Sequence, residues 1–263
     1  MTEVRRRRMT VSYDGTDFSG WQVQPGRRTV QGCLEEALSD TLGLEVRVMG
    51  AGRTDAGVHA LGQVAHFDGP AGLPPERLLA ALNTRLPPDV RVRALADAPP
   101  GFHALHSARD KTYVYQLHLV EGRAGGRAAE ALLPPLRRRT FHAIGAATDV
   151  AAMRAAARLL VGRRDFTALS KVMESGRSPV KTLHALRVLR IPHGLRVVAT
   201  ADGFLYGMMR LLSGLLVQVG AGRRGLEEVA ALLAAADRSR GPPSLPARGL
   251  LLFRVRYGTG PGA

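Results

Sequence analysis

The hydrophobic residues of this 263-residue chain alternate between the spacings of strands and of helices, which limits the folds open to it. A period of two, typical of a strand with one buried face, runs from Arg7 to Tyr13. Helical spacing follows from Val30 to Leu42, with Thr29 placed to cap the helix and Gly43 to end it. The pattern predicts an α+β protein in which strands and helices are mixed along the whole chain.

The same alternation continues to the end of the sequence in two comparable halves. Strands are predicted at 45–49, 63–67, 90–95, 112–120, 165–169, 181–191, 195–200 and 250–257, and helices at 74–86, 150–160, from about 204 onward and at 226–233. No sequence repeat is visible between the halves. The order of elements alone predicts two similar lobes, residues 1–105 and 106–263.

The charge of the chain points to a polyanionic partner. Lysine and arginine number 37 against 22 acidic residues, giving +15, and only Lys111, Lys171 and Lys181 are lysines. Coding bias in a GC-rich genome accounts for the ratio of arginine to lysine but not for the surplus of positive charge. Because the arginine fork suits phosphate and stacks on bases, nucleic acid is the favoured partner.

Other features narrow the class of protein. With 45% hydrophobic residues the chain has enough apolar material for a core, which excludes overall disorder. Cys33 is the single cysteine, so the chain forms no internal disulfide and no cysteine-based zinc site. The apolar run 204–219 is short for a membrane span and contains Arg210, and no secretory segment is visible, so we expect a cytoplasmic protein.

The stretch from Gly50 to His59 is the first candidate for chemistry. Its three glycines allow a sharp bend close to a ligand. Neither phosphate-loop pattern fits, because Walker A needs Lys and Ser or Thr after its last glycine, and a dinucleotide fingerprint needs glycine where Asp55 stands. What remains is Asp55 two residues from Arg53, read either as a nucleophile or acid–base group beside positive charge or as an aspartate that only stabilises a turn.

Arg210 stands out because its neighbours in the run 204–217 are apolar on nearly every side. A guanidinium buried there needs a carboxylate, and Asp55 is the natural candidate. The alternative is an arginine at the edge of a helix whose head group reaches solvent.

Tyr113 and Tyr115 are two residues apart on a predicted strand and therefore share a face. Tyrosine beside basic residues is a common platform for stacking bases, although core packing is the favoured interpretation for Tyr115. With few aromatic residues, the chain suits a pocket for one base. No histidine or carboxylate cluster has metal-ligand spacing, and no nucleophile-elbow motif supports a serine triad.

Taken together, these runs resemble the TruA family of tRNA pseudouridine synthases. The resemblance is carried by residues 13–22 (YDGTDFSGWQ), 28–31 (RTVQ), 52–60 (GRTDAGVHA) and 62–67 (GQVAHF), and by shorter matches at 113–115, 165–167, 204–206, 209–210 and 249–250. They extend over almost the whole chain in the family's order.

The resemblance implies two ferredoxin-like (RRM-like) lobes whose sheets join across a central catalytic cleft. It also implies isomerisation of uridine to pseudouridine at positions 38, 39 and 40 in the anticodon arm of tRNA, by a homodimer. The base is detached at N1 and rejoined through C5, so atoms are neither added nor removed and no cofactor or metal is required.

The resemblance also implies roles for four residues. Asp55 falls on the family's essential aspartate, the nucleophile, and Arg210 on the arginine that pairs with that carboxylate. Arg53 falls on the arginine implicated in flipping the target nucleotide, and Tyr113 on the tyrosine that stacks on the base and is linked to proton removal. The first lobe would carry the aspartate loop, and the second lobe Tyr113 and Arg210.

Departures from the family pattern leave fine substrate choice open. Leu105 stands where arginine is usual, Gly207 replaces a more usual polar residue, Leu211 stands where asparagine is frequent and Lys181 where arginine is common. Two other functions stay possible on the residues alone. One is a non-catalytic RNA-binding protein, and the other is a different uridine-modifying enzyme such as a methyltransferase, which the lack of a cofactor loop disfavours.

Overall fold

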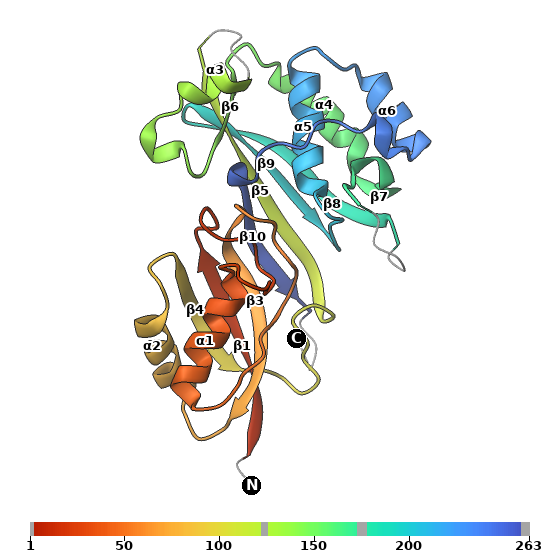
Figure 1. Ribbon diagram of the computed structural model, residues 1–263. Coiled ribbons are helices and arrows are strands. Elements are labelled where there is room, and N and C mark those ends of the chain that lie inside the picture. Colours follow the sequence, from red (N-terminus) through yellow and green to blue (C-terminus); the bar gives the residue numbers. More distant parts are fainter. Residues whose placement is uncertain (1–2, 122–125, 173–177, 259–263) are drawn as a thin grey trace. The chain divides into compact units, whose positions relative to one another are not determined.

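The computed structural model describes residues 3–121, 126–172 and 178–258 and confirms a mixed α+β protein (Figure 1). The strands are β1 (Val4–Tyr13), β2 (Met49–Gly50), β3 (His59–Pro70), β4 (Val90–Asp97), β5 (Ala108–Val120), β6 (His142–Gly145), β7 (Gly162–Asp165), β8 (Val180–Ile191), β9 (Gly194–Ala201) and β10 (Leu250–Tyr257). The α-helices are α1 (Val30–Leu42), α2 (Pro75–Arg85), α3 (Gly126–Ala131), α4 (Val150–Leu160), α5 (Met208–Gly220) and α6 (Leu226–Ala235), with short 3-10 turns at Pro135–Arg137, Thr167–Leu169, Arg238–Arg240 and Ala247–Gly249.

The chain forms two compact units. The first contains Met1–Lys111 together with Leu252–Ala263, and the second contains Thr112–Leu251. The sequence prediction placed the boundary between residues 105 and 106 and left the C-terminal strand in the second lobe. In the structure most of β10 belongs to the first unit, because it pairs beside β3. The second unit is therefore inserted into the first.

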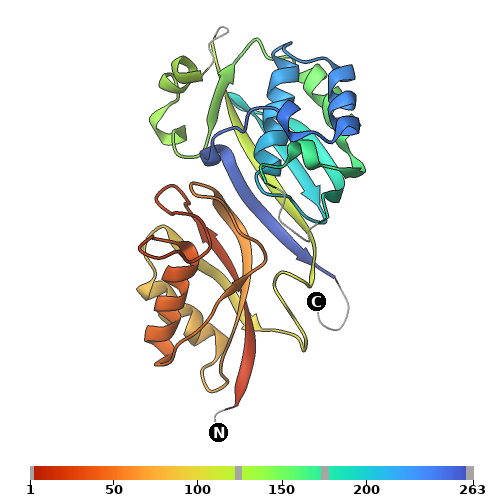
Figure 2. The same cartoon turned by 45° about the vertical axis from the view of Figure 1, so that its right-hand side comes forward.

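The first unit is a sheet with the strand order β4-β1-β3-β10, covered by α1 and α2 (Figure 2). β1 pairs antiparallel with both β3 and β4. The period-two pattern of β1 buries Met9, Val11 and Tyr13 on one face, as expected of a strand with one face in the core. Thr29 caps α1 by accepting from the Gly32 backbone N–H, and Gly43 ends the helix in the left-handed conformation, as the sequence predicted.

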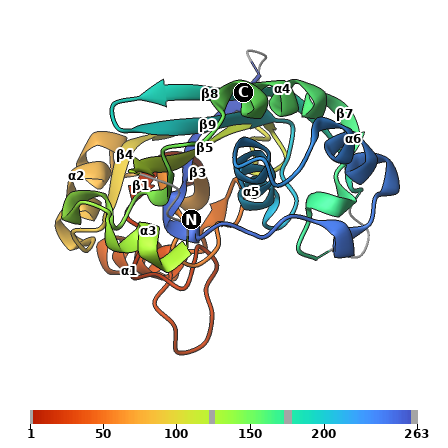
Figure 3. The same cartoon turned by 90° about the horizontal axis from the view of Figure 1, so that it is seen from above.

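The second unit has the strand order β5-β9-β8-β7, and β6 adds to β5 as a parallel neighbour. The helices α4, α5 and α6 are grouped together, as Figure 3 shows from above, and α4 packs against β8. α5 buries ten of its thirteen residues, which explains why its sequence is apolar on nearly every side. α3 lies beside β6 over a small separate cluster that includes Val120, Leu133 and Phe141.

Several predicted elements differ in extent from the structure, among them the strand expected at 63–67, which is the middle of the longer β3. The strand expected at 45–49 is reduced to β2, which pairs with two residues of β3. The strand expected at 165–169 lies earlier, at β7, and residues 167–169 form a 3-10 turn after Asp165 accepts from the Thr167 backbone N–H. The helix expected from 204 begins at Met208, because Gly207 adopts a left-handed φ of 73° that interrupts helical geometry.

Candidate active site

Asp55 lies in the loop between β2 and β3 in the first unit, and it opens a tight turn. The backbone N–H of Val58 donates to the carbonyl of Asp55 at 3.1 Å. Gly57, the third residue of the turn, has a φ of 78°, the conformation that a type II turn requires at that position. Asp55 is partly buried and Arg53 is exposed. The turn therefore fixes the backbone of the aspartate and leaves the arginine on the surface.

Thr54, the residue before Asp55, is held through its carbonyl and its hydroxyl. Its carbonyl accepts from the backbone N–H of Trp21 at 3.0 Å, and its hydroxyl lies 2.8 Å from the hydroxyl of Tyr13. Thr54, Tyr13 and Trp21 are all buried. A side chain at Gly20 would place its Cβ 2.7 Å from the carbonyl oxygen of Thr54, so glycine is needed there for the close approach.

The start of the loop is also anchored in the core. The side-chain amide of Gln63, which is fully buried, donates to the carbonyl of Gly52 at 2.8 Å. The backbone N–H of Ala51 donates to the carbonyl of Val64 at 2.7 Å. A Cβ at Gly52 would lie 3.1 Å from the Nζ atom of Lys111, so this ammonium group packs against the loop. Positive charge therefore lies at Gly52, from Lys111, and two residues before Asp55, from Arg53.

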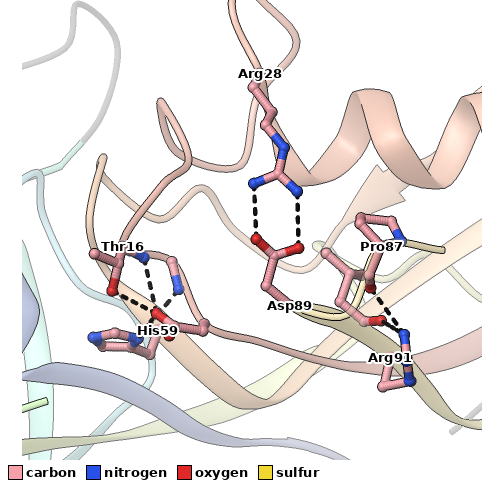
Figure 4. A network of polar contacts seen from close by, with 9 residues as sticks. Thr16, Arg28, His59, Pro87, Asp89 and Arg91 are labelled. Carbon is pink, nitrogen blue, oxygen red and sulfur yellow. Dashed lines mark hydrogen bonds and ion pairs between the residues drawn. The ribbon is translucent and has the colours of Figure 1, made fainter. Parts of the chain in front are cut away.

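The other end of the loop rests on a polar network drawn in Figure 4. The backbone N–H of Gly15 donates to Nδ1 of His59 at 3.1 Å, and a carboxylate oxygen of Asp14 lies 3.1 Å from the same nitrogen. That carboxylate also accepts from the backbone N–H of Thr16 at 3.0 Å and from its hydroxyl at 2.5 Å. These contacts tie the segment 14–16 to the first residue of β3.

Arg28 and Asp89 continue this network. They form a bidentate ion pair with both distances at 2.8 Å, and the guanidinium of Arg28 holds the pKa of the Asp89 carboxyl below its usual value (Figure 4). The carbonyl of Asp89 accepts from the backbone N–H of Asp14 at 3.0 Å. Arg28 also lies over the ring of Phe18, 4.0 Å from its centre. The segment 13–28 and the Asp55 loop are therefore joined at several buried and half-buried points.

Tyr113 lies on β5 in the second unit. Its ring meets that of Phe204 edge to face, with centroids 4.8 Å apart, and the residue is 8% exposed. Tyr115, two residues on, is fully buried and donates its hydroxyl to the carbonyl of Pro246 at 2.6 Å. A Cβ at Gly249 would lie 2.6 Å from the Tyr115 ring. The core role predicted for Tyr115 is confirmed.

Arg210 lies in the first turn of α5 in the second unit. The sequence led us to expect a buried guanidinium, whereas the residue is only partly buried. Its Nε atom donates to the carbonyl of Leu245 at 2.6 Å. Asp55 belongs to the first unit and Arg210 to the second, so the ion pair between them stays a prediction.

Two of the departures in α5 have a structural reason. Gly207 combines a left-handed φ with close packing, since a Cβ there would lie 2.7 Å from Cγ of Lys171. A polar side chain at this position would be strained by the left-handed backbone and would clash with Lys171. Leu211 is 7% exposed and contributes to the core.

The departure at Leu105 lies in a loop that is bonded to itself. Nδ1 of His103 accepts from the backbone N–H of Leu105 at 3.2 Å and of His106 at 3.3 Å. The hydroxyl of Tyr257 donates to the carbonyl of Ala104 at 2.8 Å. His106 is exposed and Leu105 is partly exposed. No structural reason for leucine at position 105 emerges.

Within 3–121, 126–172 and 178–258, no three histidine, cysteine or acidic residues are grouped so as to hold a metal ion. Over the same part of the chain, every helix is too short or too polar to cross a membrane.

Comparison with known proteins identifies the class of enzyme to which the chain belongs. A family model for one class of isomerases, described as tRNA pseudouridine synthase, matches residues 9–105 and 156–258, which include the Asp55 loop and Arg210. The chain is an enzyme of the isomerase class.

Relatives match over nearly their whole length. A protein named tRNA pseudouridine synthase A from Solidesulfovibrio magneticus is 46% identical over 97% of this chain and 92% of its own. Proteins of the same name from Frankia casuarinae and Brevibacillus brevis are 45% and 38% identical, over 96% and 97% of this chain and 89% and 100% of theirs. The chain belongs to the tRNA pseudouridine synthase family, which confirms the resemblance found in the sequence.

Sequence reasoning gave no role to the residues that hold the loop. Tyr13, Thr54 and His59 stand inside the quoted motifs, but their bonding partners are distant in sequence. Gln63 was read only as part of a strand, although a fully buried amide in a strand is itself a signal of a polar partner. The approach of Lys111 to Gly52 joins residues far apart in the sequence, so no local pattern indicates it.

Proposed function

We propose that this protein converts uridine to pseudouridine in the anticodon arm of tRNA, at positions 38, 39 and 40, without a cofactor or metal. The observation that carries the proposal is the Asp55 loop, in which Thr54 is bonded through its carbonyl and its hydroxyl, Gly52 through its carbonyl and Asp55 through a turn. A nucleophile held by its backbone loses little conformational freedom when it reacts, which lowers the barrier.

Asp55 is the proposed nucleophile. Its carboxylate forms a bond to the target nucleotide as the bond between N1 of the base and the ribose breaks. The base turns and rejoins the ribose through C5, and the bond to Asp55 breaks, which restores the free carboxylate. The hydrogen on C5 then leaves as a proton, and N1 takes up a proton, so the product has the same atoms as the substrate.

We assign supporting roles to three further residues. Arg53 is exposed and so free to enter an RNA stem and replace the flipped base. Tyr113 stacks on that base and takes part in proton removal. Arg210 pairs with the Asp55 carboxylate and holds it for attack. A base inside a stem must leave the stack before its glycosidic bond can be reached, at a cost of a few kcal/mol, roughly.

The strand orders support ferredoxin-like lobes. In the first unit the order β4-β1-β3-β10 places β1 at the centre with α1 and α2 as crossovers, as in a β-α-β-β-α-β arrangement in which the C-terminal strand fills the edge. In the second, β5-β9-β8 repeats the order of the first, third and second strands of such a unit.

The charge of +15 supports binding of a polyanion, and we propose a homodimer acting in the cytoplasm. Because bound arginines displace counterions from phosphates, tRNA affinity should fall steeply as salt is raised. An affinity that does not change with salt would contradict this part of the proposal.

The test uses purified full-length protein and an unmodified tRNA transcript with uridines at the three positions, with no added cofactor. Pseudouridine is mapped by carbodiimide labelling and primer extension, and the rate is followed by release of tritium from C5 of labelled uridine. Asp55→Asn is the matched control, since it keeps the shape of the side chain and removes its charge.

Product at those sites with the wild type, and none with Asp55→Asn at undiminished tRNA binding, would support the proposal. Tight tRNA binding without product from either protein would refute it and indicate an RNA-binding protein. Release of tritium from C5 only after a methyl donor is added, without pseudouridine, would indicate a different uridine-modifying enzyme.

A further inference from the structure

The contact between Tyr13 and Thr54 is a buried hydrogen bond directly beside the proposed nucleophile. The two hydroxyl oxygens lie 2.8 Å apart, and the two residues are 5% and 6% exposed. Thr54 is covalently joined to Asp55, and its carbonyl is already bonded to Trp21. Thr54 is therefore held at its side chain and at its carbonyl, the group directly before Asp55.

Tyr13 is suited to hold Thr54 in one place. It comes from the last position of β1, a central strand of the first unit that pairs on both sides. Burial raises the pKa of its phenol well above the usual value, although hydrogen bonds with Thr54 and Gln63 oppose the shift. The phenol therefore stays neutral and keeps its proton at any working pH.

The loop has a further bond that stabilises it without touching Thr54. Gln63 donates to the carbonyl of Gly52, and together with the bond from the Ala51 N–H to the Val64 carbonyl it holds the start of the loop against β3. The Tyr13 bond is therefore not needed merely to keep the loop closed. Its distinctive effect is on the residue that precedes Asp55.

We propose that Tyr13 is a positioning residue for the isomerisation, acting through the hydroxyl of Thr54 to set the place of the Asp55 carboxylate. This inference rests on the proposed role of Asp55 as nucleophile. Small displacements of a reacting group lower rates strongly, since the reacting atoms must lie within a narrow range of distance and angle. The expected defect is in kcat, because Tyr13 is buried and does not reach the substrate.

The test compares Tyr13→Phe, Thr54→Val and the double variant. Each change removes one hydroxyl and leaves a side chain of nearly the same shape. Each single change removes the bond between the two hydroxyls and lowers stability, and Tyr13→Phe also removes the contact with Gln63. The double change leaves neither hydroxyl facing an apolar partner and recovers part of that loss. Thermal unfolding reports stability, and tritium release under saturating tRNA reports kcat.

A positioning role predicts that kcat falls about tenfold or more in each single variant and stays low in the double variant, with KM within about twofold of wild type. Tyr257→Phe is the matched control. It removes the same atom from a bond to the Ala104 carbonyl in the same unit, away from the loop, and should keep kcat within about twofold of wild type.

Two results would overturn the inference while leaving the proposed function standing. One is wild-type kcat in Tyr13→Phe and Thr54→Val. The other is recovery of kcat together with stability in the double variant, which would show a purely structural bond. If Asp55→Asn makes pseudouridine as fast as the wild type, the nucleophile assignment fails first, and the inference fails with it.

Discussion

His66 provides a stability switch that can be measured by lowering the pH. It is 4% exposed, and its Nδ1 accepts from the backbone N–H of Ala104 at 3.1 Å. Burial, together with the positive charges of Arg6 and His103, lowers the pKa of His66 to about 4, while Asp68 opposes the shift. Protonation would also place a hydrogen on the nitrogen that accepts from Ala104.

The direction of the effect depends on the pH at which His66 takes up its proton in the folded and in the unfolded state. In the unfolded chain a histidine is protonated below a pH of about 6.5, whereas folded His66 stays neutral down to about 4. Between these values the unfolded state binds more protons, so the free energy of unfolding falls as the pH falls. From pH 7 to pH 5 this single group removes about 1–2 kcal/mol.

The assay is urea unfolding followed by tryptophan fluorescence. Trp21 is the single tryptophan and is 2% exposed in the first unit, the unit that contains His66, so its emission reports the relevant part of the molecule. His66→Asn keeps an acceptor near the position of Nδ1 and does not titrate. The variant should lose less stability than the wild type between pH 7 and pH 5.

His184→Asn is the control, since His184 is exposed and belongs to the second unit. Its free energy of unfolding should change between pH 7 and pH 5 by the same amount as that of the wild type. Equal losses of stability in wild type and His66→Asn would refute the reasoning, because they would show that His66 takes up its proton alike in the folded and unfolded states.

Three further changes test the packing and charge around the site. Gly50→Ala would place a Cβ 2.7 Å from the buried ring of Trp21 and should lower the free energy of unfolding by about 1–3 kcal/mol, whereas Gly72→Ala, whose Cβ meets nothing within 4 Å, should be nearly neutral in the same urea assay. Gly207→Ala combines a left-handed φ with a clash against Lys171 and should lower stability by about 1 kcal/mol or more; calorimetric unfolding at wild-type temperature would contradict this. Arg256→Ala leaves the buried Asp110 carboxylate without its bidentate partner, whereas Arg28→Ala does the same to Asp89, which is partly accessible to water. Arg256→Ala should therefore destabilise the first unit more than Arg28→Ala, and the reverse order in urea unfolding would disprove the argument.

Local patterns in the sequence predicted those parts of the fold that depend on local chemistry. Thr29 and Gly43 bound α1 as expected, because capping involves only neighbouring residues. The start of α5 was misplaced by four residues, since the apolar run from 204 hides the left-handed glycine that interrupts it. The place of β10 beside β3 joins residues nearly two hundred apart, and no short-range pattern encodes it.

The candidate site divides in the same way. The loop around Asp55 could be picked out because its glycines and charges are contiguous. Its supports could not, because the bonds of Tyr13 to Thr54 and of Gln63 to Gly52 depend on strand register. Arg210 was expected to be buried from the run around it, but its place in the first turn of α5 leaves it partly accessible, since the helix begins only two residues earlier.

The return of β10 to the first unit has a consequence for how the chain is made. Translation delivers residues 1–111 early, yet the strand that completes their sheet follows only after the whole second unit, Thr112–Leu251. At about 5–20 residues per second, the edge of β3 beside which β10 pairs waits roughly 10–30 s for its neighbour. During that time the edge of β3, the strand that follows the Asp55 loop, is open outside the ribosome. Nascent chains of this enzyme should therefore depend on chaperones until the last strand is released.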